Sequence, residues 1–156
     1  MKVALYARVS TDDQGQNPET QLFRLRQLAQ ARSYEITGEY VDYASGKDAR
    51  RPKLQEMLED ARNHRFDKIL ILRLDRMMRS VTNLWNVLND LERWGVGLEC
   101  ADQSIDTQSP QGRFMITILE AVAEFERDLT RTRVKEGMAR AKAEGKHCGR
   151  PRKSKA

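Results

Sequence analysis

A serine, two aspartates and several arginines stand directly after three short apolar runs of the sequence. They are Arg8 and Ser10 after the first run, Asp42 after the second, and Asp75 and Arg76 after the third. The runs have the length of strands, and in an open parallel sheet the residues beyond the carboxyl ends of the strands gather at one edge. We therefore predict that these side chains share one site.

The arginines of this set indicate a phosphate ligand. Arg51 follows the second run and Arg79 comes three residues after Arg76, so we expect both to reach the same edge. Crowded guanidinium groups need a counter-anion, and they grip phosphate through paired hydrogen bonds. A surface salt-bridge pair is the alternative for Arg76 and Arg79, but the start of a helix is an unfavourable place for cations.

Ser10 is the candidate nucleophile. A serine between a strand and a helix is more often a turn or cap residue, so its position alone is a weak indication. The sequence contains no Walker-type loop and no G-x-S-x-G elbow. Its two histidines, His64 and His147, lie at the end of a predicted helix and in the C-terminal tail. A serine among arginines without histidine is suited to attack on a phosphodiester, whose developing charge the guanidinium groups would stabilise.

The elements that must position these residues alternate between strands and helices. Short apolar runs predict the strands, and amphipathic stretches predict the helices. The expected strands are 3–7, 36–41, 69–74 and 96–101. One expected helix begins at Pro18, and two others cover 52–64 and 80–94. This order predicts an α/β fold with a mainly parallel central sheet and helices on both faces.

A single long helix is predicted after Pro110, because about 35 helix-favouring residues follow without another proline. Its apolar residues recur at alternating spacings of three and four, which is a heptad seam. We define this seam as Met115, Ile118, Val122, Phe125 and Leu129. The seam predicts association between helices, and packing of the seam on the chain's own sheet is the alternative.

The C-terminal part carries an excess of positive charge. Residues 130–156 hold ten Lys or Arg and two Glu, a net charge of +8 in a chain of net +5, so the remainder carries −3. Such a segment is expected to meet a polyanion such as DNA, although charge alone also fits a solubilising tail. We predict a catalytic α/β domain over 1–110, an oligomerisation and arm helix over 111–145 and a basic tail over 146–156.

Composition argues against several classes of protein. No apolar run reaches the about 18 to 20 residues of a membrane helix, and the apolar start is too short for a signal peptide. Cys100 and Cys148 lack the spacing of a metal site or a disulfide framework. We expect a soluble, cytoplasmic protein with no metal site.

Taken in order, the motifs of the chain resemble those of the serine recombinases, the resolvase and invertase group. The matching motifs are YARVST at 6–11, Gln14, Gln21, Asp42 with ASG at 44–46, LDR at 74–76 with Arg79, Gly112, the stretch 118–127, and GRPR at 149–152. The resemblance covers nearly the whole chain, and YARVST is its most specific part.

The resemblance implies a site-specific DNA recombinase that cleaves and rejoins DNA through a 5'-phosphoserine intermediate. Ser10 would attack a backbone phosphate, and no cofactor would be needed because the covalent link conserves the bond for religation. Arg8, Arg76 and Arg79 would hold the scissile phosphate with help from Arg51, and Asp75 would orient the arginines or share in proton transfer. The supporting positions would be Tyr6, Gln14, Gln21, Asp42 and Glu126.

The implied partners are double-stranded DNA and further copies of the chain, as a homodimer that assembles into a synaptic tetramer through the seam. The DNA-binding residues would be Arg131, Arg133, Lys135, Arg140, Lys142, Arg150 and Arg152, with the GRPR stretch in the minor groove. Family members normally continue into a helix-turn-helix, which is missing before Ala156, so we expect a catalytic fragment. Met78 also departs from the family pattern, in which a small residue is commoner.

Two other functions fit parts of the sequence. A non-catalytic DNA-binding or assembly module could regulate a full-length recombinase, but it would not require the serine and the arginines together. A flavodoxin-like or receiver-type phosphate-binding domain would leave the seam and the basic segment unexplained.

Overall fold

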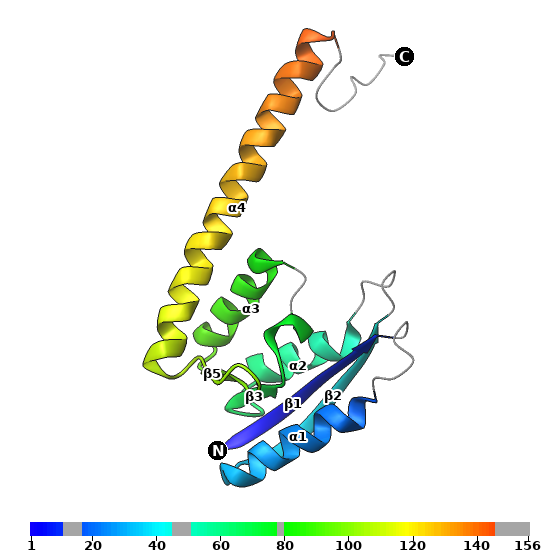
Figure 1. The fold of residues 1–156 in the computed structure, drawn as a ribbon, viewed down its shortest axis with the longest axis vertical. Coiled ribbons are helices and arrows are strands. Elements are labelled where there is room, and N and C mark those ends of the chain that lie inside the picture. The colour runs from blue at the N-terminus through cyan, green and yellow to red at the C-terminus, as the bar shows by residue number, and fades with distance from the viewer. Residues whose placement is uncertain (11–16, 45–50, 78–79, 146–156) are drawn as a thin grey trace.

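A five-stranded sheet forms the centre of the part of the chain that our computed structural model describes, residues 1–10, 17–44, 51–77 and 80–145 (Figure 1). The strand order is β2-β1-β3-β4-β5. The strands are β1 (Lys2–Ser10), β2 (Glu35–Ala44), β3 (Lys68–Ile71), β4 (Gly97–Cys100) and β5 (Ile105–Asp106). All adjacent pairs are parallel except β4 and β5. The predicted mainly parallel sheet is confirmed, whereas two-residue β5 is too short to leave a periodic pattern in the sequence.

Helices cover both faces of this sheet, as predicted. They are α1 (Pro18–Ala31), α2 (Pro52–Arg62), α3 (Val81–Arg93) and α4 (Pro110–Ala143). Side chains alternate along β1, so Leu5 packs against Leu25 of α1 on one face, while Tyr6 packs in the core with α2 and α3 on the other. All four residues of β3 are buried, as expected for a central parallel strand.

The helices begin where the sequence predicts. A proline occupies the first turn of α1, α2 and α4, where its missing N–H leaves no bond unmade. Asn17, Ser80 and Ser109 cap α1, α3 and α4 with side-chain oxygens that accept backbone N–H groups. Gly95 takes a positive φ of 71° just after α3, as predicted for a glycine that ends a helix.

Three strand ends differ from the prediction and bear on the site. β2, predicted to end at residue 41, continues through Ala44, so Asp42 lies within the strand. β1 continues through Ser10 because its last residues pair with β2, so Ser10 ends a strand. β3 ends at Ile71, and the 3₁₀ turn η1 (Leu74–Arg76) follows, with the Leu74 amide donating to Gln103 Oε1 at 3.0 Å. Asp75 and Arg76 therefore lie on η1 and do not follow the strand directly.

The long helix α4 spans 34 residues and projects far beyond the body (Figure 1). Its buried residues are Gly112, Ile116 and Ala123, on the side that packs against α3. Met115 of the seam is partly buried. The other four seam residues are exposed, and their exposed fractions range from 39% at Val122 to 63% at Phe125. The alternative that the seam packs on the chain's own sheet therefore fails for these four exposed residues, whereas Met115 does pack against the core.

None of the helices within the described ranges is both long and apolar enough to cross a membrane.

Candidate active site

The carboxyl ends of β1 and β2 lie side by side and form the edge predicted to hold the site. Arg8 is paired in register with Asp42, and Ser10 with Ala44. Ser10 is the last residue of β1, and its side chain lies outside the described part of the structure. The strand pairing thus places the backbone of Ser10, the candidate nucleophile, two residues beyond Arg8 at the carboxyl end of the sheet.

Asp42 is buried and joins β2 to the start of α2. Its carboxylate accepts hydrogen bonds from Tyr6 Oη at 3.0 Å and from the amides of Lys53 and Leu54 at 3.0 and 2.9 Å. These two amides belong to the first turn of α2, where N–H groups lack partners within the helix and negative charge is favoured. Asp42 therefore caps α2 from the neighbouring strand and fixes the entry to that helix.

Tyr6 acts as a hydrogen-bond donor in this cluster. Burial raises its pKa well above the usual range, and the Asp42 carboxylate raises it further. The positive charges of Arg51 and Arg8 oppose this shift without cancelling it. Tyr6 consequently stays protonated at neutral pH and holds Asp42 in place.

Arg51 links α2 to η1. It is only 7% exposed, and its Nη1 donates to the carbonyl oxygen of Met77 at 2.7 Å and to that of Arg76 at 3.5 Å. Arg51 also lies near enough to Tyr6 for its charge to act on the pKa of that residue. Its hydrogen bonds also hold the turn that carries Asp75 and Arg76.

Arg8 carries the clearest sign of an external ligand. Its Nε atom is buried and has no hydrogen-bond partner among the described residues. A buried donor left unpaired costs about 1 to 3 kcal/mol, and more on a charged group. Gln21 fixes the backbone here, since its Nε2 donates to the carbonyl oxygen of Arg8 at 3.0 Å. With its backbone held by Gln21, Arg8 has a buried Nε–H group that an anion could accept from.

The structure brings Tyr6, Arg8, Asp42 and Arg51 together, with Gln21 supporting them from α1. Arg76 is half-buried on η1, and the Asp75 side chain lies outside the described part of the structure. The remaining predicted residues outside the described ranges are Gln14, Arg79, Arg150 and Arg152.

Glu126 occupies a different place from this cluster. It lies on α4 and accepts a hydrogen bond from Thr82 Oγ1 of α3 at 3.2 Å. Around this contact is a groove of about 700 Å³ lined by Thr82, Glu126, Arg127, Leu129, Thr130, Arg131 and Arg133. Sequence reasoning did not single out Arg127, because it precedes the basic segment, although it lies within the motif stretch 118–127.

The predicted DNA-binding residues that the structure describes are all exposed along the projecting part of α4. They are Arg131, Arg133, Lys135, Arg140 and Lys142. Arg131 pairs with Asp128 at 3.4 Å and Arg140 with Glu144 at 3.2 Å. Exposed pairs of this kind contribute little, so a phosphate can replace either carboxylate.

The known proteins to which this chain is similar include resolvases and DNA-invertases. The family described as the resolvase N-terminal domain matches residues 3–147. The probable DNA-invertase y4cG of Sinorhizobium fredii is 39% identical over 146 residues, which cover 94% of this chain and 45% of that protein. The DNA-invertase hin of Salmonella typhimurium is 38% identical over 147 residues, which cover 94% of this chain and 72% of that protein.

Solved structures show the same relationship. A resolvase family site-specific recombinase from Streptococcus pneumoniae has a TM-score of 0.77 and 32% identity, covering 92% of this chain and 99% of that one. The N-terminal catalytic domain of TP901-1 integrase has a TM-score of 0.74 and 36% identity, covering 83% and 98% respectively. The chain thus spans less than half of one curated relative but nearly all of these two solved chains.

Proposed function

This chain belongs to the resolvase family of recombinases, and we propose that it is the catalytic part of a site-specific DNA recombinase that cleaves and rejoins DNA through a phosphoserine intermediate. The buried Nε of Arg8, which has no hydrogen-bond partner within the described ranges, carries the proposal, because Arg8 lies two residues before Ser10 at the carboxyl end of β1. A backbone phosphate of DNA is the anion that would meet both groups.

The reaction is a transfer of the phosphoryl group from one oxygen to another. Ser10 Oγ attacks the phosphorus, the bond to the 3' oxygen breaks, and the DNA keeps a 5'-phosphoserine link beside a free 3'-hydroxyl. Attack by a 3'-hydroxyl on that link then restores a phosphodiester and frees Ser10. The number of phosphate ester bonds is unchanged in each step, so this reaction balances without an added energy source.

The surrounding residues have two kinds of role in this proposal. Arg8, Arg76 and Arg79 neutralise the charge that develops on the phosphate oxygens, and stabilisation of this kind often supplies most of an enzyme's rate enhancement. Asp75 orients these arginines or shares in proton transfer. The positioning residues are Arg51 through η1, Asp42 and Tyr6 through the start of α2, Gln21 through the Arg8 backbone, and Gln14 and Glu126 as supporting positions.

Covalent trapping on DNA tests the proposal. The chain is fused to a DNA-binding domain of known site, presented with paired sites and denatured during the reaction. We expect a protein–DNA adduct at a 5' phosphate whose modified peptide contains Ser10. A chain that binds this DNA and forms no adduct would instead favour the non-catalytic assembly module.

Assembly through the α4 seam is part of the same proposal. Ile118, Val122, Phe125 and Leu129 are exposed, and a row of apolar side chains at heptad spacing favours pairing with another helix. We infer that two chains form a dimer through this seam and that two dimers form the synaptic tetramer.

A charge on the seam should therefore dissociate the dimer. We expect Phe125→Glu to weaken dimerisation at least tenfold in sedimentation equilibrium, because the carboxylate would lose its water at the interface. Thr117→Glu is the matched control, since Thr117 is exposed on α4 but lies off the seam. Equal dimerisation of the two variants would show that the seam is not the interface.

We call residues 130–145 the basic arm. This arm should account for much of the affinity for DNA that does not depend on the DNA sequence. Residues 130–145 are almost entirely exposed, so a chain ending at Leu129 keeps its core. We expect this deletion to lower DNA affinity and to reduce the slope of log K against log salt by about 0.9 for each phosphate that the arm had neutralised. Fluorescence anisotropy at several salt concentrations measures the slope. An unchanged slope would make the arm a solubilising tail.

A further inference from the structure

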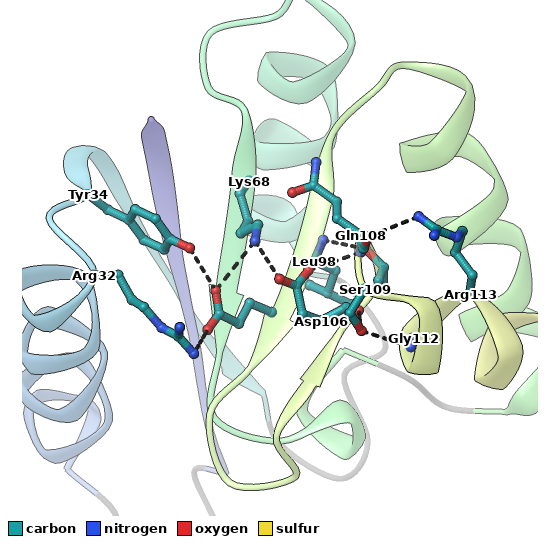
Figure 2. A network of polar contacts seen from close by, with 11 residues as sticks. Arg32, Tyr34, Lys68, Leu98, Asp106, Gln108, Ser109, Gly112 and Arg113 are labelled. Atoms are coloured by element: carbon teal, nitrogen blue, oxygen red, sulfur yellow. Dashed lines mark hydrogen bonds and ion pairs between the residues drawn. The ribbon is translucent and has the colours of Figure 1, made fainter.

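A second polar cluster crosses the sheet near the amino ends of β2 and β3, away from the catalytic edge. Figure 2 shows Arg32 and Tyr34 on one side, Lys68 in the middle, and Asp106, Ser109 and Gly112 at the start of α4 on the other. The proposed reaction uses none of these residues.

Lys68 is the centre of this cluster. Its side chain is only 3% exposed, and its Nζ lies 2.8 Å from Asp106 Oδ2 and 3.5 Å from Glu99 Oε2. Glu99 is itself buried and is held by Tyr34 Oη at 3.3 Å and by Arg32 at 3.4 Å. Burial opposes the charge of Lys68, but the hydrogen bond and negative charge of Asp106, together with the electrostatic influence of Tyr34 and Glu99, outweigh it and raise the pKa of Lys68. The cluster therefore contains a charged lysine in the interior.

Asp106 connects this lysine to α4. Its Oδ1 accepts from the amide of Gln108 at 3.0 Å, and its carbonyl oxygen accepts from Ser109 Oγ at 2.7 Å. Ser109 Oγ in turn accepts from the amide of Gly112 in the first turn of α4. Each atom of Asp106 that can accept a hydrogen bond is thus used either toward Lys68 or toward the start of α4.

The first turn of α4 is also seated on the backbone of Asp106. A Cβ atom added at Gly112 would lie 1.8 Å from the Asp106 carbonyl oxygen and 2.8 Å from Thr107 Cα. No side chain intervenes between the helix and this loop. A displacement of Asp106 toward Gly112 would therefore have to move the first turn of α4.

We propose that Lys68 and Asp106 are positioning residues, and that their ion pair, buried at Lys68 and partly exposed at Asp106, fixes the base of α4 and so the direction in which α4 presents its seam and arm. The part concerning the seam and arm rests on the proposed function. A buried ion pair adds little net stability compared with apolar residues. The 2.8 Å contact between Lys68 Nζ and Asp106 Oδ2 would, however, be lost if Asp106 moved away from β3. A fixed first turn suits α4, because in the proposed dimer α4 must meet the same helix of another copy at a defined angle.

Hydrogen exchange of the full chain tests this proposal. In Lys68→Met, Glu99 keeps Tyr34 and Arg32, and Asp106 is 33% exposed and can reach water, so the variant is expected to fold. We expect the amides of 106–116 to exchange at least tenfold faster, with less than a twofold change in α1, and the dimer to dissociate at least tenfold more readily. Asp106→Asn provides a second variant, because it removes the charge while an oxygen remains for Gln108.

Leu28→Ala is the control for a general loss of stability, because Leu28 is partly buried and packs against the core on the α1 face. It should speed exchange without weakening dimerisation. Faster exchange spread over all elements in Lys68→Met, or unchanged exchange over 106–116 in both variants, would overturn the proposal. Since exchange needs no DNA, this result is independent of whether the phosphoserine adduct forms.

Discussion

Ser10→Ala is expected to abolish the covalent adduct and strand cleavage while folding and DNA affinity stay unchanged. The proposed mechanism places the attacking oxygen on this side chain, and loss of a nucleophile of this kind lowers the rate by about 10⁴-fold or more. Alanine keeps the backbone pairing of residue 10 with Ala44 at the end of β1. The measurement is adduct formation on a denaturing gel, with binding followed by anisotropy.

Thr20→Ala is the matched control for Ser10→Ala, because it also removes one hydroxyl but lies exposed on α1. It should form the adduct at the rate of the original chain. An adduct that persists in Ser10→Ala would show that another group attacks the phosphate, and the reaction would then have to be assigned to a different residue.

Gly112→Ala is expected to displace the start of α4. The added methyl group would lie 1.8 Å from the carbonyl oxygen of Asp106, and the neighbouring atoms are backbone, which cannot rotate away. Overpacking against a rigid neighbour typically costs about 1 to 3 kcal/mol and occasionally more. We expect a loss of about 3 kcal/mol in the free energy of unfolding, measured by urea denaturation.

Gly137→Ala is the control in the same helix, because a Cβ there meets nothing within 4 Å. Alanine is favoured over glycine inside a helix by about 1 kcal/mol, so the helical content of α4 should not fall. If Gly112→Ala unfolds at the same urea concentration as the original chain, the first turn of α4 can shift on β5, and the base of the helix is not rigid.

Several features of the site could be predicted because they depend on local patterns. The apolar runs predicted the strands, and the rule for parallel sheets placed Arg8, Ser10 and Asp42 at one edge, where the backbone of the structure also has them. The seam was predicted from spacing alone, and the exposure of Ile118, Val122, Phe125 and Leu129 removed the alternative that these residues pack on the sheet. The errors at the ends of β1, β2 and β3 arose because pairing between strands, which decides where a strand stops, involves residues distant in sequence.

The sequence by itself determined the order of strands and helices, the common location of Arg8, Ser10 and Asp42 at the carboxyl ends of two strands, and the apolar row of α4, because residue type and spacing along a few turns are sufficient for each. Only the tertiary structure decided that Asp42 caps α2, that Arg51 holds η1 and that Lys68 reaches Asp106 at the base of α4. These contacts join residues that are far apart along the chain. They form only when the sheet brings separate strands and helices within hydrogen-bond distance, and no local pattern records that distance.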